Sequence, residues 1–253
     1  MPTIFVAGAS GAVGRFLLPL LRAEGRRVVG LTRRPEKCAL LASLGAEPVV
    51  ADVFDREALL RAMEAAQPQI IIHQLTDLPP GLEPTLMEKA ATLNARIRDE
   101  GTANLVAAAV NCGADRLIAQ SIAFAYAPGP LPYAEDAPLA VDAEGRASVS
   151  ARGIASLERQ VCEAPLAGLV LRYGKFYGPG TGFDQPPPSG PLHVEAAAWA
   201  AALAVTRGSP GIYNVAEDDG TVNSAKAKRE LGWSADMRSR AQVALAAASL
   251  GDH

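Results

Sequence analysis

Short apolar runs rich in β-branched residues alternate with longer stretches of helical periodicity through the first two thirds of the chain. The runs predict six strands, at Thr3–Ala7, Arg27–Leu31, Glu47–Ala51, Gln69–Gln74, Arg116–Gln120 and Leu166–Arg172. The stretches between them predict helices at Ala12–Glu24, Glu36–Leu44, Arg56–Ala66, about 83–110 and near Ala155–Cys162. Because strands and helices take turns, the pattern predicts right-handed βαβ units and an α/β fold with a doubly wound parallel sheet.

Two segments interrupt this alternation. Residues 127–146 are rich in proline, glycine and acidic residues, and residues 178–191 contain five prolines, so both are predicted to be loops. Each follows the end of a strand, where ligands bind in this architecture. We therefore expect a single domain over residues 1–253, with a small substrate lobe built from about 127–146, 174–195 and 207–240.

A glycine-rich turn follows the first predicted strand. Gly8, Gly11 and Gly14 have the spacing G-x-x-G-x-x-G and lead directly into an amphipathic helix. Glycines let backbone amides approach a pyrophosphate, and the start of a helix adds partial positive charge. This context indicates a nucleotide-binding fold of the Rossmann type. The predicted cofactor contacts here are Gly8, Ser10, Gly11, Ala12 and Val13.

The end of the second strand bears on the choice of cofactor. A protein that binds NAD usually has an Asp or Glu there to bind the ribose 2′-hydroxyl, but this chain has Thr32, Arg33 and Arg34. Guanidinium groups would bind a 2′-phosphate, which favours NADP over NAD. The alternative is that both arginines are solvated in a turn. Asp52 is placed to accept a hydrogen bond from the adenine amino group, or else to cap the next helix.

Charge and cysteine content exclude several partners. Twenty-four basic and 27 acidic residues give a formal net charge of −3, which does not favour nucleic acid or an anionic membrane. The three cysteines fit no metal-binding spacing and are expected to be reduced thiols in a cytoplasmic protein. We predict no metal site, no signal peptide and no membrane-spanning segment.

Several further motifs resemble the extended branch of the short-chain dehydrogenase/reductase superfamily, which contains epimerases and dehydratases. They are Asp52-Val53, His73–Thr76, Gly101–Leu105, Leu171–Gly180, His193–Glu195 and Tyr213–Val215. The resemblance implies a bound nicotinamide dinucleotide, a small-molecule substrate and a homodimer formed through the helices at 83–110 and 148–163. It adds seven expected cofactor contacts: Val53, Gln74, Leu75, Thr76, Gln120, Tyr173 and Phe176.

The chain departs from the catalytic pattern of that superfamily. The family's Tyr-x-x-x-Lys pair provides a proton donor and a lysine that lowers its pKa. Counting along the motifs places Ser150 at the tyrosine position and Ile154 at the lysine position. The candidates to replace the pair are Ser121, Ser150 and Lys175. Four tyrosines are also expected to line the cleft: Tyr126, Tyr133, Tyr173 and Tyr177.

Three functions fit these observations. The first is an NADP-dependent oxidoreductase that acts on a small carbonyl or alcohol through an atypical proton donor. The second is a non-catalytic NADP-binding redox sensor or interaction protein. The third is a nucleotide-sugar epimerase or dehydratase, although the short segment Thr181–Leu192 leaves little chain to hold a sugar nucleotide.

Overall fold

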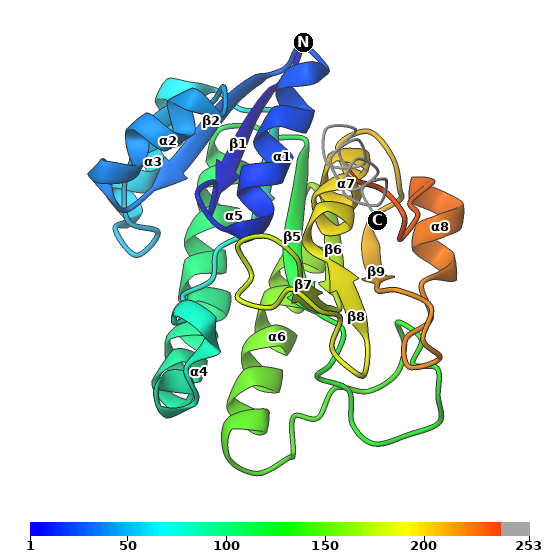
Figure 1. Ribbon diagram of the computed structural model, residues 1–253. Coiled ribbons are helices and arrows are strands. Elements are labelled where there is room, and N and C mark those ends of the chain that lie inside the picture. The colour runs from blue at the N-terminus through cyan, green and yellow to red at the C-terminus, as the bar shows by residue number, and fades with distance from the viewer. Residues whose placement is uncertain (239–253) are drawn as a thin grey trace, which may run out of the picture.

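The protein, seen in a computed structural model, is built around one parallel sheet (Figure 1). The structure describes residues 1–238, and of Pro80 only the backbone. The sheet has the strand order β3-β2-β1-β4-β5-β6-β9. The bounds are β1 Thr3–Ala7, β2 Arg27–Thr32, β3 Glu47–Val50, β4 Ile70–His73, β5 Arg116–Ile122, β6 Ala167–Tyr173 and β9 Gly211–Val215. The predicted α/β fold with a doubly wound parallel sheet is confirmed, and all six predicted strands are present.

Helices cover both faces of the sheet (Figure 1). On one face lie α1 (Ala12–Ala23), α2 (Cys38–Ser43), α7 (Val194–Ala204) and α8 (Ala225–Leu231). On the other lie α3 (Arg56–Ala66), α5 (Thr102–Asn111) and α6 (Gly145–Glu163), with α4 (Met87–Arg96) packed beside α6. Successive residues of β1 enter opposite cores, Ile4 and Val6 on one face and Phe5 and Ala7 on the other. A strand buried on both faces explains its continuous apolar sequence.

The predicted helix over 83–110 is not continuous. Pro84 begins a short 3-10 turn, Pro84–Leu86, before α4, because the proline ring disfavours a helical conformation in the residue before it. A π-helical turn, Ile97–Gly101, then separates α4 from α5. The helices named for a dimer interface, α4 and α6, pack against each other. The dimer itself stays a prediction.

The chain beyond β6 contains elements for which the apolar pattern gave no range. They are β7 (Lys175–Tyr177), β8 (Pro191–His193), α7, β9 and α8. Seven of the eleven residues of α7 are alanine and the helix is buried nearly all round, so it has no polar face to mark its period. The predicted loops at 127–146 and 178–191 are confirmed except at their last residues, where α6 and β8 begin.

Of the expected lobe segment 207–240, residues 239 and 240 lie outside the described residues. Within residues 1–238, no helix has the length and apolarity needed to cross a bilayer. The same residues hold no group of histidine, cysteine and acidic side chains that could bind a metal ion.

Candidate active site

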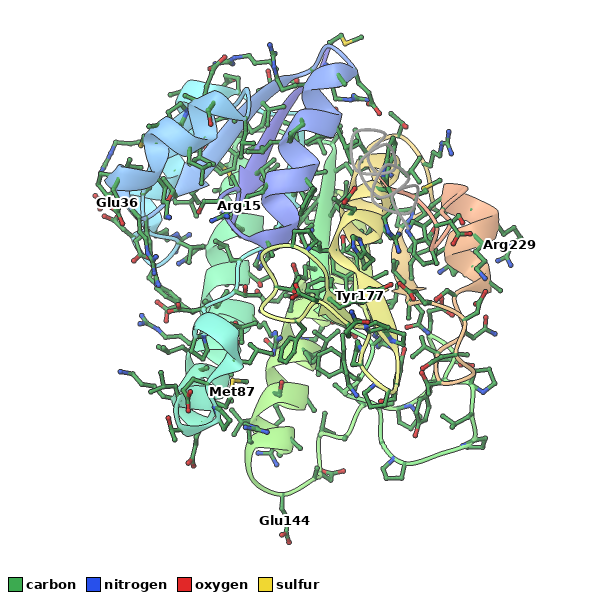
Figure 2. All side chains as sticks on the ribbon, viewed as in Figure 1. Arg15, Glu36, Met87, Glu144, Tyr177 and Arg229 are labelled. Carbon is green, nitrogen blue, oxygen red and sulfur yellow. The ribbon has the colours of Figure 1, made fainter. Side chains whose placement is uncertain are left out.

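A cleft of about 1680 Å³ runs along the carboxyl ends of the central strands. It extends from the glycine turn to the space between α4 and α6. Figure 2 marks its extent: Arg15 lies at the turn, and Met87 and Glu144 lie at the far end. Every predicted cofactor contact lines this cleft, and so do two of the three catalytic candidates, Ser150 and Lys175.

The glycine turn leaves no room for side chains. Gly8 has φ of +87°, and a Cβ on it would lie 2.4 Å from the backbone oxygen of Gln74. A Cβ on Gly14 would lie 2.3 Å from the backbone oxygen of Ala9. Gly11 is the N-cap of α1 and makes no side-chain cap, so the first amides of α1 are available to an anion in the cleft. This geometry fits the pyrophosphate of a dinucleotide.

Gln74 supports the same interpretation. Its side chain is 4% exposed and lines the cleft, and apart from its influence on the nearby Tyr173 hydroxyl, neither the amide nitrogen nor the amide oxygen has a well-formed hydrogen bond within residues 1–238. A buried polar group without a partner is costly, so such groups usually face a ligand. The amide can donate one hydrogen bond and accept another, as a cofactor ribose or carboxamide would require.

The end of β2 presents cations to the cleft. Arg33 and Arg34 are exposed, and Arg33 pairs with Asp77 at 3.0 Å. The hydroxyl of Thr32 accepts a hydrogen bond from the Arg34 amide at 3.1 Å and shapes this turn. Lys37, which the sequence analysis did not single out, also lines the cleft here. Asp77, which lines the cleft here, is neutralised by Arg33, and the exposed Glu36 that follows Arg34 in the chain does not line the cleft.

Asp52 and Asp55 divide the roles that the sequence left open. Asp55 caps α3 by accepting from the Ala58 amide at 2.9 Å. Asp52 lines the cleft and accepts from the Phe54 amide at 2.9 Å through one oxygen. Asp52 therefore does not cap the helix. Its role toward an adenine stays a prediction.

His73, at the end of β4, belongs to the core. Its Nε2 lies 3.1 Å from the Thr102 hydroxyl, and its Nδ1 accepts from the Leu75 amide at 3.2 Å. Burial, with the nearby positive charge of Arg98, lowers the pKa of His73 to about 4. The imidazole is therefore neutral at neutral pH, and the accepting Nδ1 leaves the proton on Nε2.

Ser150 and Ile154, the residues at the two expected catalytic positions, lie in different environments. Ser150 lines the cleft, and its hydroxyl accepts a hydrogen bond from the Arg98 guanidinium at 3.2 Å. Ile154, one helical turn further along α6, is fully buried in the core. Arg98 lies on the π-helical turn and also lines the cleft. Sequence reasoning missed Arg98, because its contact with Ser150 joins residues on two different helices.

Ser121 is placed behind the cleft, which corrects its proposed catalytic position. It is 1% exposed, does not line the cleft, and donates to a carboxylate oxygen of Glu158 at 2.7 Å. Glu158 in turn binds Arg172 through two hydrogen bonds of 2.8 and 2.7 Å, with both side chains buried. Ser121 thus belongs to a structural ion-pair network, because the acceptor Glu158 draws its hydroxyl toward α6.

Two of the four expected tyrosines line the cleft. Tyr126 shares its hydroxyl with Asn214 and Arg172, and burial raises its pKa. Tyr173 is fully buried and donates to the backbone oxygen of Ala197 at 3.1 Å. Tyr133 and Tyr177 do not line the cleft, and neither do the groups that their hydroxyls contact. Each cleft phenol is therefore engaged within the protein and is a poor candidate for proton donor.

Lys175 is the remaining candidate. Its ammonium donates to the hydroxyl of Ser189 at 2.7 Å and lies 5.9 Å from the centre of the Phe124 ring. Both Lys175 and Phe124 line the substrate end of the cleft, so Lys175 could present a cation to a bound molecule there.

The sheet, the glycine turn and the orphaned Gln74 amide define a dinucleotide-binding α/β protein. The NAD dependent epimerase/dehydratase family matches residues 4–252, and the chain belongs to that family. The resemblance stated from the motifs is confirmed. The family's nicotinamide cofactor fits the residues present, since the turn accommodates a pyrophosphate and Gln74 offers unused hydrogen bonds.

Known proteins resemble this chain at different levels. A Streptomyces protein named 3-diazoavenalumate denitrifying reductase is 43% identical over 243 residues, covering 85% of this chain and 76% of the relative. The UDP-glucose 4-epimerase of Thermotoga maritima superposes with a TM-score of 0.74 at 16% identity, covering 93% and 94% of the two chains. The enzyme WbmG of Bordetella bronchiseptica, in complex with NAD, has a TM-score of 0.69 at 18% identity, covering 94% and 90%. The last two likenesses establish the fold alone.

Proposed function

We propose that this protein is an NADPH-dependent reductase that replaces the diazo group of a small aromatic substrate by hydrogen. One observation carries the proposal: the positions where the family has its proton-donating Tyr and its Lys hold Ser150 and Ile154. Ser150 is held by Arg98, and Ile154 is buried in the core. The function must therefore be one that does not depend on this pair.

Reduction of a diazonium group meets that condition. A bound, reduced nicotinamide supplies a hydride. An arenediazonium carbon that accepts the hydride forms a C–H bond and loses N₂, which departs with the electron pair of the broken C–N bond. The products are a neutral arene and N₂, and no proton is consumed. Reduction of a ketone, in contrast, leaves an alkoxide that needs a proton.

The printed name of the Streptomyces relative supports this choice. It describes a reductase that denitrifies a diazo compound, and that protein shares 43% identity with this chain. The residues that would hold the cofactor are those of the glycine turn, the end of β2 and Gln74. The apolar Ile122 and Phe124 would flank an aromatic ring at the substrate end.

NADP is favoured over NAD by the charges at the end of β2. Arg33, Arg34 and Lys37 line the cleft, and Asp77, the carboxylate near them, pairs with Arg33. A 2′-phosphate is attracted to such a cluster, and bidentate guanidinium contacts suit it.

A second candidate is reduction of a small carbonyl compound, with Lys175 as the proton donor. The observation in its favour is that Lys175 lines the cleft and holds an ammonium at the substrate end. This candidate predicts that Lys175→Met abolishes turnover. Diazo reduction predicts that Lys175→Met retains it.

The deciding experiment offers the purified protein NADPH labelled with deuterium at the nicotinamide C4, together with simple arenediazonium salts or a panel of aldehydes and ketones. We expect saturable oxidation with the diazonium salts, one N₂ released per NADPH, and deuterium at the vacated ring carbon. Reactions without protein correct for direct reduction of these reactive salts.

One control variant sharpens the result. Ser150→Ala should retain diazo reduction, whereas loss of a general acid would lower the rate by roughly 100-fold or more. Turnover of carbonyl compounds alone would contradict the diazo proposal. Tight NADPH binding without turnover of any compound would contradict an enzyme and favour the redox-sensor alternative.

A further inference from the structure

Arg98 is a cleft-lining cation that the protein itself does not neutralise. Its guanidinium is partly buried, and its one side-chain hydrogen bond within residues 1–238 goes to the Ser150 hydroxyl. It forms no ion pair within those residues, because Glu158, whose charge acts on it, is bound to Arg172 through both oxygens. Burial lowers the pKa of Arg98 to about 10, so the group stays protonated at neutral pH.

The local backbone conformation directs Arg98 into the cleft. Arg98 lies on the π-helical turn Ile97–Gly101, where the chain passes from α4 to α5. Such turns insert an extra residue into a helix and are frequent at functional sites. The turn faces α6, so Arg98 reaches Ser150 and brings a positive charge to the helix where Ile154 provides none.

The phosphates of a bound cofactor have other partners in the cleft. The pyrophosphate fits the glycine turn at the start of α1, and a 2′-phosphate fits Arg33 and Arg34 at the end of β2. Three acidic residues of the described chain line the cleft, and none of them forms an ion pair with Arg98: Asp77 pairs with Arg33, Asp52 follows β3, and Figure 2 shows the side chain of Glu144 pointing outward from the tip of α6. A charge left unpaired in a partly buried site is costly, so a substrate anion would be bound there.

We propose that Arg98, assisted by the Ser150 hydroxyl, binds a carboxylate of the substrate and thereby selects aromatic carboxylates. The planar guanidinium offers parallel N–H groups that match the two oxygens of a carboxylate. Leu78, Leu82, Met87 and Phe124 also line this cleft and suit the apolar body of such a molecule. This inference deepens the proposed function and rests on it for the identity of the pocket.

The test measures binding and needs no turnover. Isothermal titration of the protein saturated with NADP⁺ compares trans-cinnamate with its uncharged methyl ester, a matched pair. We expect the acid to bind more tightly than the ester. Because a desolvated charge pair is lost, Arg98→Gln should weaken cinnamate binding by roughly 30-fold or more and remove the preference over the ester. Ser150→Ala should produce a smaller loss in the same direction.

A matched control is Arg159→Gln, which removes the same charge from an exposed position of α6 that does not line the cleft. It should leave cinnamate binding unchanged. Fluorescence titration with NADPH checks the rival role: if Arg98→Gln weakens NADPH as much as cinnamate, Arg98 serves the cofactor and the proposal is overturned. Equal binding of acid and ester by the unmodified protein, or no binding of the acid, also overturns it.

The outcome separates this inference from the proposed function. If the protein prefers cinnamate through Arg98 but reduces no diazonium salt, the carboxylate site is supported and the proposed diazo chemistry is contradicted. A protein that reduces arenediazonium salts without a carboxylate as well as those with one would support the proposed chemistry and contradict the carboxylate site.

Discussion

The two ends of the cleft differ in how their residues are brought together: one is formed by local sequence motifs, the other by contacts between distant elements. At the cofactor end, each contact comes from a short motif that follows one strand: the glycine turn after β1, Arg33 and Arg34 after β2, and Asp52 after β3. At the substrate end, the contacts join elements distant in the chain, as Arg98 and Ser150 do across 52 positions. Local motifs therefore define how this protein holds a dinucleotide, and tertiary packing defines what it does with it.

The largest expected effect tests whether the buried ion pair behind the cleft stabilises the fold. Arg172→Met leaves Glu158 and its two oxygens buried without a cation, which should lower the free energy of unfolding by about 3–5 kcal/mol. Urea denaturation measures the loss. The folded fraction should bind NADPH normally, since neither Arg172 nor Glu158 lines the cleft. A loss below about 1 kcal/mol, as for an exposed pair, would contradict the structural role given to this network.

The next effect concerns His73, which is buried in the core at the end of β4. Folded His73 stays neutral down to about pH 4, whereas an unfolded histidine titrates near 6.5. Between these values the unfolded chain takes up a proton that the folded protein excludes. Stability should therefore fall as the pH drops from 6.5 to about 4.

His73→Gln removes this term, which amounts to roughly 3 kcal/mol. Urea unfolding of both proteins over that pH range should give a shallower slope for the variant. Parallel slopes would mean that the imidazole is not excluded from protonation in the folded state.

The smallest expected effect lies at the cofactor end. Arg33→Asp should weaken NADPH binding by roughly 10- to 100-fold, as expected for loss of a charge-assisted hydrogen bond, and should spare NADH. Fluorescence titration with both cofactors measures the ratio. Because Asp77 would then face a second carboxylate, Arg33→Gln is the control for simple repulsion. Equal weakening of NADPH and NADH would show that Arg33 does not read the phosphate.

Much of the fold could be predicted because its signals are local. The doubly wound parallel sheet needed no side-chain detail, because apolar strands that alternate with helices lead to this architecture. The break at Pro84 and the π-helical turn were missed, since a continuous helical period does not reveal an inserted residue. The alanine-rich α7 was missed because its burial depends on the sheet and α1 around it.

The site divides in the same way. Gly8, Gly11 and Gly14 are set by the space a Cβ would need, which a motif records. Ser121 was expected in the cleft because it stands next to Gln120, but adjacent strand residues point to opposite faces, and Glu158 holds its hydroxyl on the far side. No local pattern distinguishes Arg98 from the exposed Arg96, two residues earlier at the end of α4.

The buried Ile154 has a consequence for protein engineering. A lysine at this position would carry its ammonium into a fully enclosed site, where an unpaired charge is costly. A tyrosine in place of Ser150 would remove the hydroxyl that now accepts a hydrogen bond from Arg98. The family's Tyr-Lys pair therefore cannot be introduced here by two substitutions alone, because the residues around both positions would also have to change.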